Sequence, residues 1–237
     1  MTVVTDDQQL WDEPAFVAVV LASLGAALAV GWSAAVAVGV HQQYDATQLT
    51  VTLLARETAA LLTLDFLAKR YLGITWSDLG LRRIRWGQVA LGVVLGLIVM
   101  VLSAVLLATF DVRGEAYVMH AAGTLPWRLA LFAMVGVYSP VVQEIVFRGL
   151  LLQGLLQRTP GWVAIVVSSA IFALVHAGSG AGSVINAFLF GILQGVLFVR
   201  FRSLTAPIAA HIAVNSFTML SILSALYRAD PFAGLAR

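Results

Sequence analysis

Side chains that could hydrolyse a peptide bond occur in three otherwise apolar stretches of the second half of the chain. They are Gln143, Glu144 and Arg148 in the first stretch, His176 in the second, and His211 and Asn215 in the third. A carboxylate and an imidazole can hold a water molecule and take its proton. A second imidazole and a carboxamide can donate hydrogen bonds to an oxyanion. The same carboxylate and two histidines could instead ligate a zinc ion, so a divalent metal is an open alternative.

Each stretch taken alone also has a structural explanation. Glu144 and Arg148 are four residues apart with the acid first, which is the favourable order for an ion pair within a helix. Pro140 leaves a carbonyl one turn back without its hydrogen bond, which could admit water. A single histidine in a membrane helix is often only hydrogen-bonded to a neighbouring helix. The occurrence of all these groups on three separate segments is what favours a site.

An earlier apolar stretch carries Arg56, Glu57 and Asp65. An ionisable group inside a membrane is costly unless it is paired or hydrated. Arg56 and Glu57 are adjacent and point to different parts of the helix surface, so we expect them to pair with other helices. Structural ion pairs are the favoured explanation here, ahead of a role in a site.

The composition limits the class of protein to which these residues belong. Of the 237 residues, 60% are hydrophobic and 11% are charged, whereas soluble domains carry about 25% charged residues. A soluble enzyme and a disordered chain are therefore excluded. The chain has no cysteine, which excludes disulfides, thiolate metal sites and a cysteine nucleophile. The basic residues are not massed on one face, so we expect no nucleic acid as a partner. The apolar composition predicts membrane lipid as a partner, and the candidate site predicts a peptide or protein substrate in the membrane.

Apolar runs of about 20 residues, the length that crosses a bilayer, predict an all-α polytopic transmembrane bundle of about seven spans. We place these spans at 15–40, 47–68, 87–110, 127–157, 162–178, 182–200 and 204–226. The runs are continuous rather than alternating, which disfavours strands. We predict a single integral-membrane domain over 1–237, with a short N-terminal tail at 1–14. The sequence makes no prediction of the oligomeric state.

The basic residues predict an orientation for the bundle. The connections after the second, fourth and sixth spans hold eight of the fourteen basic residues, which places them in the cytoplasm. Seven spans then give a cytoplasmic N-terminus and an outer C-terminus, in a plasma (inner) membrane. The connector 69–86 is amphipathic and could lie on the membrane surface, or it could be a basic connector that only sets the topology.

The ordered motifs of the second half resemble the CPBP intramembrane proteases, which include CAAX prenyl endopeptidases and bacterial relatives linked to bacteriocin self-immunity. These motifs are Glu144-x3-Arg148, Phe172-x3-His176, His211-x3-Asn215, FRGLL at 147–151 and the phrase from Leu72-Gly73 to Gly80-Leu81. The resemblance covers roughly 70–226. It implies an intramembrane endopeptidase that acts on a membrane-associated or lipid-modified substrate, at a site that opens toward the cytoplasm.

The resemblance also implies roles for the individual residues. In the family, a glutamate and the histidine that matches His176 activate water. The residues that match His211 and Asn215 stabilise the oxyanion, and those that match Glu144 and Arg148 contribute to the architecture of the site. We expect Arg148 to hold Glu144 charged and oriented.

Gln143 departs from the family pattern, because it falls where the family has the first of two adjacent glutamates. An amide cannot accept a proton at neutral pH, and general-base catalysis is worth about 10²–10⁴-fold in rate. One explanation is that Glu144 has taken over the base role and acts with His176. Another is a catalytically silent member that serves as a membrane binding, scaffold or immunity protein. The third is an engineered Glu→Gln substitution.

The depths of the two histidines in the predicted spans do not agree. At about 1.5 Å per residue, His176 lies near the outer end of its span and His211 lies nearer the inside. Both can face Glu144 only if helices tilt, kink or begin deeper than these limits. Pro207 and Gly178 mark places where such breaks would occur.

Overall fold

The computed structural model describes residues 13–39, 45–110, 112 and 124–229, so most of the predicted tail at 1–14 lies outside the described residues. No described residue is in a strand. The α-helices are α1 (Glu13–Ala37), α2 (Ala46–Leu67), α3 (Trp86–Thr109), α4 (Leu125–Ala133), α5 (Ser139–Glu144), α6 (Gln153–Leu156), α7 (Gly161–Leu174), α8 (Gly180–Phe201) and α9 (Thr205–Ala229). These helices match the seven predicted spans with ends that differ by a few residues, and the all-α class is confirmed.

Five helical runs among the described residues are long and apolar enough to cross a membrane. They are Pro14–Ala37, Trp86–Thr109, Leu125–Leu156, Ala177–Phe201 and Thr205–Ser224. Large apolar side chains such as Trp32, Leu62 and Leu102 project outward, each more than 60% exposed. Lipid chains accommodate such a surface, and helices satisfy their own backbone polar groups within it. The chain is a multi-pass integral membrane protein.

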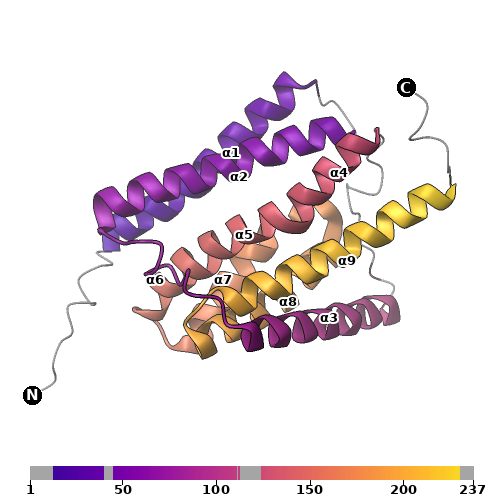
Figure 1. The fold of residues 1–237 in the computed structure, drawn as a ribbon. Helices are drawn as coiled ribbons and strands as arrows, with labels where there is room; N and C mark the ends of the chain where they lie inside the picture. The colour runs from indigo at the N-terminus through magenta and orange to yellow at the C-terminus, as the bar shows by residue number, and fades with distance from the viewer. Residues whose placement is uncertain (1–12, 40–44, 111, 113–123, 230–237) are drawn as a thin grey trace, which may run out of the picture.

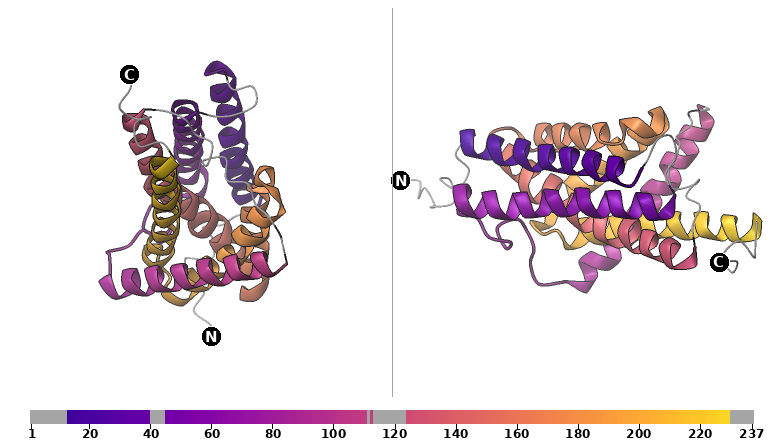
Figure 2. Two further views of the ribbon diagram at one scale, coloured as in Figure 1. Left: turned by 90° about the vertical axis from the view of Figure 1, so that its right-hand side faces the viewer. Right: turned by 90° about the horizontal axis from the view of Figure 1, so that it is seen from above.

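One continuous helical run, 125–156, lies in the middle of the bundle. It contains α4, α5 and α6, joined by the π-helical segments Met134–Tyr138 and Ile145–Leu152. Figure 1 shows α1 and α2 side by side along one flank of this run, with α9, α8 and α3 on the other. The end-on view in Figure 2 agrees with this arrangement, and residue contacts join α2, α7, α8 and α9 to the run. Every helix that carries a candidate site residue therefore contacts the segment that contains Glu144.

Pro140 shapes this central run, but it does so differently from the prediction. In the π-helical segment Met134–Tyr138 the backbone bonds reach five residues back, so Pro140, which has no N–H, leaves the carbonyl of Val135 without its partner. Asn215 of α9 donates from Nδ2 to that oxygen at 2.9 Å, and Ser216 Oγ donates to the next carbonyl at 3.3 Å. The backbone acceptors beside the proline are thus bonded to α9 rather than opened to water.

The connector between α2 and α3 is packed more deeply than either sequence interpretation anticipated. Ile74 and Leu79 are buried in the core. Asp78 accepts hydrogen bonds from the side chain and backbone of Thr75, which lower the pKa of its carboxyl. Gly80 has a φ of +91°, and a Cβ there would lie 2.9 Å from the ring of Phe198. The turn at Gly80 therefore packs against the bundle, and both its backbone conformation and its close contact with Phe198 favour glycine.

The positions of two helix ends remove the conflict in depth. The N–H of Leu204 donates to the carbonyl of Gly80 at 2.9 Å, and Leu204 is fully buried. Helix α9 therefore begins beneath the connector rather than at the surface. Helix α7 has 14 residues and is about 21 Å long, short of the roughly 30 Å hydrocarbon core. His176, just beyond its end, consequently lies inside the bundle.

The packing of α3 on α9 yields a stability prediction. A Cβ added at Gly92 would overlap the carbonyl oxygen of Ala206, whereas one at Gly87 would meet nothing within 4 Å. We expect Gly92→Ala to lower the free energy of unfolding by about 1–3 kcal/mol, since overpacking forces the two backbones apart. Gly87→Ala on the same helix is the matched control and should cause no loss. Thermal unfolding in detergent checks this, and equal stability of the two variants would contradict it.

Candidate active site

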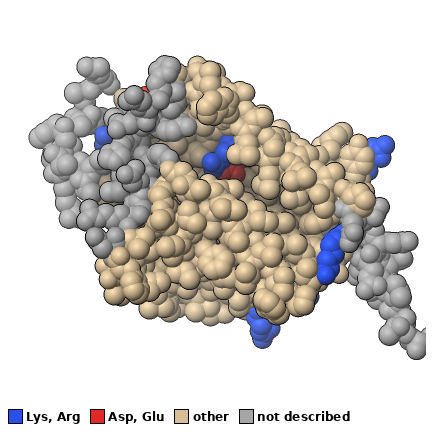
Figure 3. All heavy atoms as spheres, turned by 180° about the vertical axis from the view of Figure 1, so that it is seen from behind, with Lys and Arg blue, Asp and Glu red and all other residues tan. Residues whose placement is uncertain are grey.

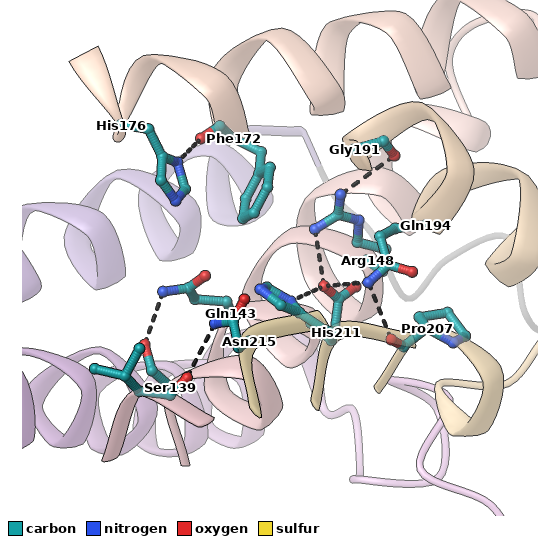
Figure 4. Close-up of polar contacts among 12 residues, drawn as sticks. Ser139, Gln143, Arg148, Phe172, His176, Gly191, Gln194, Pro207, His211 and Asn215 are labelled. Atoms are coloured by element: carbon teal, nitrogen blue, oxygen red, sulfur yellow. Dashed lines mark hydrogen bonds and ion pairs between the residues drawn. The ribbon is translucent and has the colours of Figure 1, made fainter. Parts of the chain in front are cut away.

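A buried carboxylate lies at the centre of the site. Glu144 has no exposed surface, and its Oε1 accepts hydrogen bonds from three helices or helical segments. The donors are Arg148 Nη1 at 3.2 Å, Gln194 Nε2 at 3.2 Å and His211 Nδ1 at 2.7 Å. Figure 4 shows these donors converging on the carboxylate. The predicted ion pair between Glu144 and Arg148 is confirmed.

Arg148 ties this carboxylate to two neighbouring helices. Its Nη2 donates to the carbonyl of Gly191 in α8 at 3.2 Å, and its guanidinium lies 4.5 Å from the ring centre of Phe172 in α7. Phe172 also meets the rings of His176 and His211 edge-on, at 4.9 and 5.9 Å. The ring of Phe172 is therefore in contact with both imidazoles and with the guanidinium of Arg148.

The hydrogen bond at Nδ1 sets the chemistry of His211. An ionised carboxylate only accepts hydrogen bonds, so Nδ1 of His211 is the donor to Glu144. The other nitrogen, Nε2, is then a lone-pair acceptor in the neutral ring and a donor in the protonated ring. The imidazole of His211 and the carboxylate of Glu144 are thus in direct contact, with 2.7 Å between Nδ1 and Oε1.

His176 has the complementary arrangement. Its Nδ1 lies 2.9 Å from the carbonyl oxygen of Phe172, which can only accept, so Nδ1 carries a hydrogen and Nε2 has the lone pair. His176 has no direct hydrogen bond to Glu144 among the described residues. The expected pair of Glu144 and His176 is therefore not in contact, and the imidazole that contacts Glu144 is that of His211. This distribution leaves His176 able to take a proton at Nε2.

Gln143 belongs to a second polar network, on the α2 side of the central run. Its Nε2 donates to Ser139 Oγ at 2.8 Å and to Glu57 Oε1 at 3.2 Å, and Ser139 Oγ donates to the same Glu57 oxygen at 2.8 Å. Arg56 completes it with an ion pair to Glu57 at 2.6 Å. Arg56 and Glu57 were expected to pair with other helices. The ion pair instead joins the two neighbours, because the long arginine side chain bends back, while Glu57 also accepts hydrogen bonds from α5.

A cavity of about 340 Å³ joins the two networks. Helices α2, α5, α7, α8 and α9 all contribute to its wall, and its polar lining includes Arg56, Ser139, Gln143, His176, Asn186, His211 and Asn215. Figure 3 shows the molecule from behind: most of this face is uncharged, a few basic side chains lie around its rim, and a basic and an acidic group lie together in a hollow near its centre. Water in such a cavity would be enclosed by an otherwise apolar bundle.

The zinc alternative does not fit this donor set. The described residues contain no group of three or more histidine, cysteine, aspartate or glutamate side chains placed to hold a metal. His211 Nδ1 and Glu144 Oε1 are bonded directly to each other, and the guanidinium of Arg148 lies 3.2 Å from the same oxygen. A cation bound there would be repelled by that positive charge.

Two contributors to the site, Ser139 and Gln194, were not singled out from the sequence. For Glu57, a structural ion pair was favoured over a role in the site. Gln194 is fully buried within an apolar span and donates to both Glu144 and the carbonyl of Pro207. The available signal was polarity: a glutamine or glutamate in a span that is otherwise apolar needs a partner.

Comparisons with known proteins agree with the geometry. Residues 125–217, less than half of the chain, match a family model described as type II CAAX prenyl endopeptidase Rce1-like. A Bacillus subtilis (strain 168) protein named "Putative membrane peptidase YdiL" is 27% identical over 103 residues, which is 44% of this chain and 40% of that protein. No solved structure matches. Both matches point to a protease, and they confirm the predicted resemblance: over the segment that holds the site, the chain is similar to the Rce1-like membrane peptidases of the CPBP family.

Proposed function

We propose that the protein is an intramembrane endopeptidase that hydrolyses a peptide bond of a membrane-associated or lipid-modified substrate. The observation that carries this proposal is the cavity inside an apolar bundle, with two histidines that have different hydrogen-bond partners. One imidazole has its Nδ1–H bonded to a neutral carbonyl, and the other is bonded to a carboxylate. An acid–base pair with distinct environments is what hydrolysis by water requires.

In the proposed reaction, His176 activates the water. A water molecule bound at Nε2 of His176 attacks the carbonyl carbon of the substrate, and its proton passes to Nε2. The new C–O bond places a negative charge on the former carbonyl oxygen. When the tetrahedral intermediate collapses, the C–N bond breaks and the proton on His176 goes to the leaving nitrogen. Water is thereby divided between the two products.

His211 and Asn215 stabilise the oxyanion in this proposal. Protonated His211 donates from Nε2, and Glu144 supports that charge through Nδ1. Asn215 Nδ2 uses one N–H on the carbonyl of Val135 and has a second available for the substrate oxygen. Glu144 thus acts through His211 and is a positioning residue. Arg148 orients Glu144 through the buried ion pair, with 3.2 Å between Nη1 and Oε1.

We propose that the protein lies in a plasma (inner) membrane with its N-terminus in the cytoplasm. The basic connections after the second, fourth and sixth spans support this orientation through the positive-inside rule. The substrate would approach through the lipid, since the outward face is apolar. The catalytically silent alternative uses the same cavity to bind a membrane peptide without cutting it.

Hydrolysis in ¹⁸O-labelled water tests the proposal. The purified protein in lipid vesicles is incubated with membrane-anchored peptides, with and without a lipid modification, and the products are analysed by mass spectrometry. We expect one ¹⁸O atom in the new terminal carboxylate, because water supplies that oxygen. The double substitution His176→Ala, His211→Ala should give no product above background. Stable binding of these peptides without any labelled product would favour the silent alternative.

A further inference from the structure

The hydrogen bonds around Gln143 determine which end of its amide faces the cavity. One atom of the amide lies 3.2 Å from Glu57 Oε1 and 2.8 Å from Ser139 Oγ. An ionised carboxylate only accepts hydrogen bonds, so this atom must be the amide nitrogen. Ser139 uses its own hydrogen on Glu57, and its oxygen therefore accepts the second N–H of Gln143. Both hydrogens of the amide are therefore used, one on Glu57 and one on Ser139.

The carbonyl oxygen of Gln143 is left as the free end of this side chain. Gln143 lines the same cavity as His176, and Figure 4 shows the two side chains extending toward each other from α5 and the end of α7. An amide oxygen cannot take a proton, but it can accept a hydrogen bond from water and orient it. The lone pair at Nε2 of His176 can then receive the other proton of the same water.

Glu57 is the origin of this arrangement. It is 4% exposed, and its Oε1 receives the hydrogen bonds of Gln143 and Ser139 together with the ion pair to Arg56. Its negative charge is therefore balanced, and it makes the reversed orientation of the Gln143 amide unfavourable, since two acceptor oxygens would then face each other at about 3 Å. Glu57 lies on α2, outside the segment 125–217 that matches the family model.

We propose that Glu57 is a positioning residue that fixes the amide of Gln143, so that its carbonyl oxygen orients the attacking water toward His176. This inference rests on the proposed endopeptidase function. It accounts for a glutamine where the family has a glutamate. The water-orienting oxygen is retained, the proton goes to His176, and the negative charge is supplied from the neighbouring helix.

The first test is Glu57→Gln, with Asp65→Asn as the matched control. Both substitutions neutralise one acid on α2, but Asp65 pairs with Lys69 on the partly exposed side of the helix. A neutral group at position 57 allows both orientations of the Gln143 amide. We expect kcat to fall about 100-fold with little change in KM, as expected for a misplaced reacting group. Asp65→Asn should cleave at the unmodified rate, and a normal kcat for Glu57→Gln would overturn the inference.

An exchange of the two side chains separates positioning from a purely structural role. In the double variant Glu57→Gln, Gln143→Glu, the amide at 57 donates to a carboxylate at 143 that faces the cavity. We expect its rate to be at least that of the unmodified protein. Gln143→Glu alone places two carboxylates about 3 Å apart, which must share a proton, so a new ionisation should appear in its pH profile. A double variant no faster than Glu57→Gln would overturn the inference.

A measurement independent of catalysis distinguishes this inference from the proposed function. In ¹⁵N-glutamine-labelled protein, the side-chain amide signal that disappears in Gln143→Glu belongs to Gln143. We expect the hydrogens of this amide to exchange slowly with solvent, because they are hydrogen-bonded to Glu57 and Ser139. In Glu57→Gln they should exchange at least 10-fold faster. Unchanged exchange would overturn the positioning role even if proteolysis is observed. Accelerated exchange without any proteolysis would leave the positioning of Gln143 intact and remove only its catalytic use.

Discussion

Arg148→Met is expected to lower the free energy of unfolding by about 3–5 kcal/mol, because it leaves a buried carboxylate without its charged partner. Glu144 and Arg148 are both fully buried, with 3.2 Å between Arg148 Nη1 and Glu144 Oε1. Methionine retains the apolar length of the side chain but cannot donate to Glu144 or to the carbonyl of Gly191. Thermal unfolding in detergent, together with the yield of folded protein, measures the loss.

Two further variants make this result interpretable. Asp65 and Lys69 form the same i, i+4 pair at a partly exposed position, and Lys69→Met should cost no more than about 0.5 kcal/mol because solvent screens that pair. The double substitution Glu144→Gln, Arg148→Met removes both charges and should recover much of the stability. If Arg148→Met is as stable as Lys69→Met, the buried pair is not what holds these helices together.

Substitution of either histidine is expected to lower kcat, by an amount that depends on its role. His176→Ala should reduce kcat by about 10²–10⁴-fold, the usual contribution of a general base. His211→Ala should reduce it by about 10²–10³-fold, the usual cost of removing one oxyanion donor. Cleavage of a membrane-anchored peptide in vesicles measures both values. Unchanged melting temperatures would show that the losses are catalytic.

The pH profile tests the role of His176. A general base must be unprotonated to take a proton from water, so the rate of cleavage by the unmodified enzyme should fall at low pH. This fall should remain in His211→Gln, which keeps His176. Its loss in His211→Gln would contradict the assignment of the base to His176.

The sequence predicted more of the bundle than of its interior contacts. The spans followed from apolar runs, and the ion pair between Glu144 and Arg148 followed from their spacing on one helix. The three motifs that carry the site residues also carried the resemblance to the family. The ion pair between Arg56 and Glu57 was not predicted, since spacing on a helix indicates where side chains start and not how far a long one bends.

By itself, the sequence determined that this is a helical membrane protein with polar groups on three late spans, because hydropathy and helix spacing are local properties. The tertiary structure decided which of those groups meet. The burial of Leu204 beneath the connector, the short α7 and the π-helical turns beside Pro140 set the relative depths of the helices. These features placed His211 on Glu144, Asn215 on the carbonyl of Val135 and Glu57 beside Gln143. Such contacts depend on the packing of helices distant in sequence, and no local pattern specifies them.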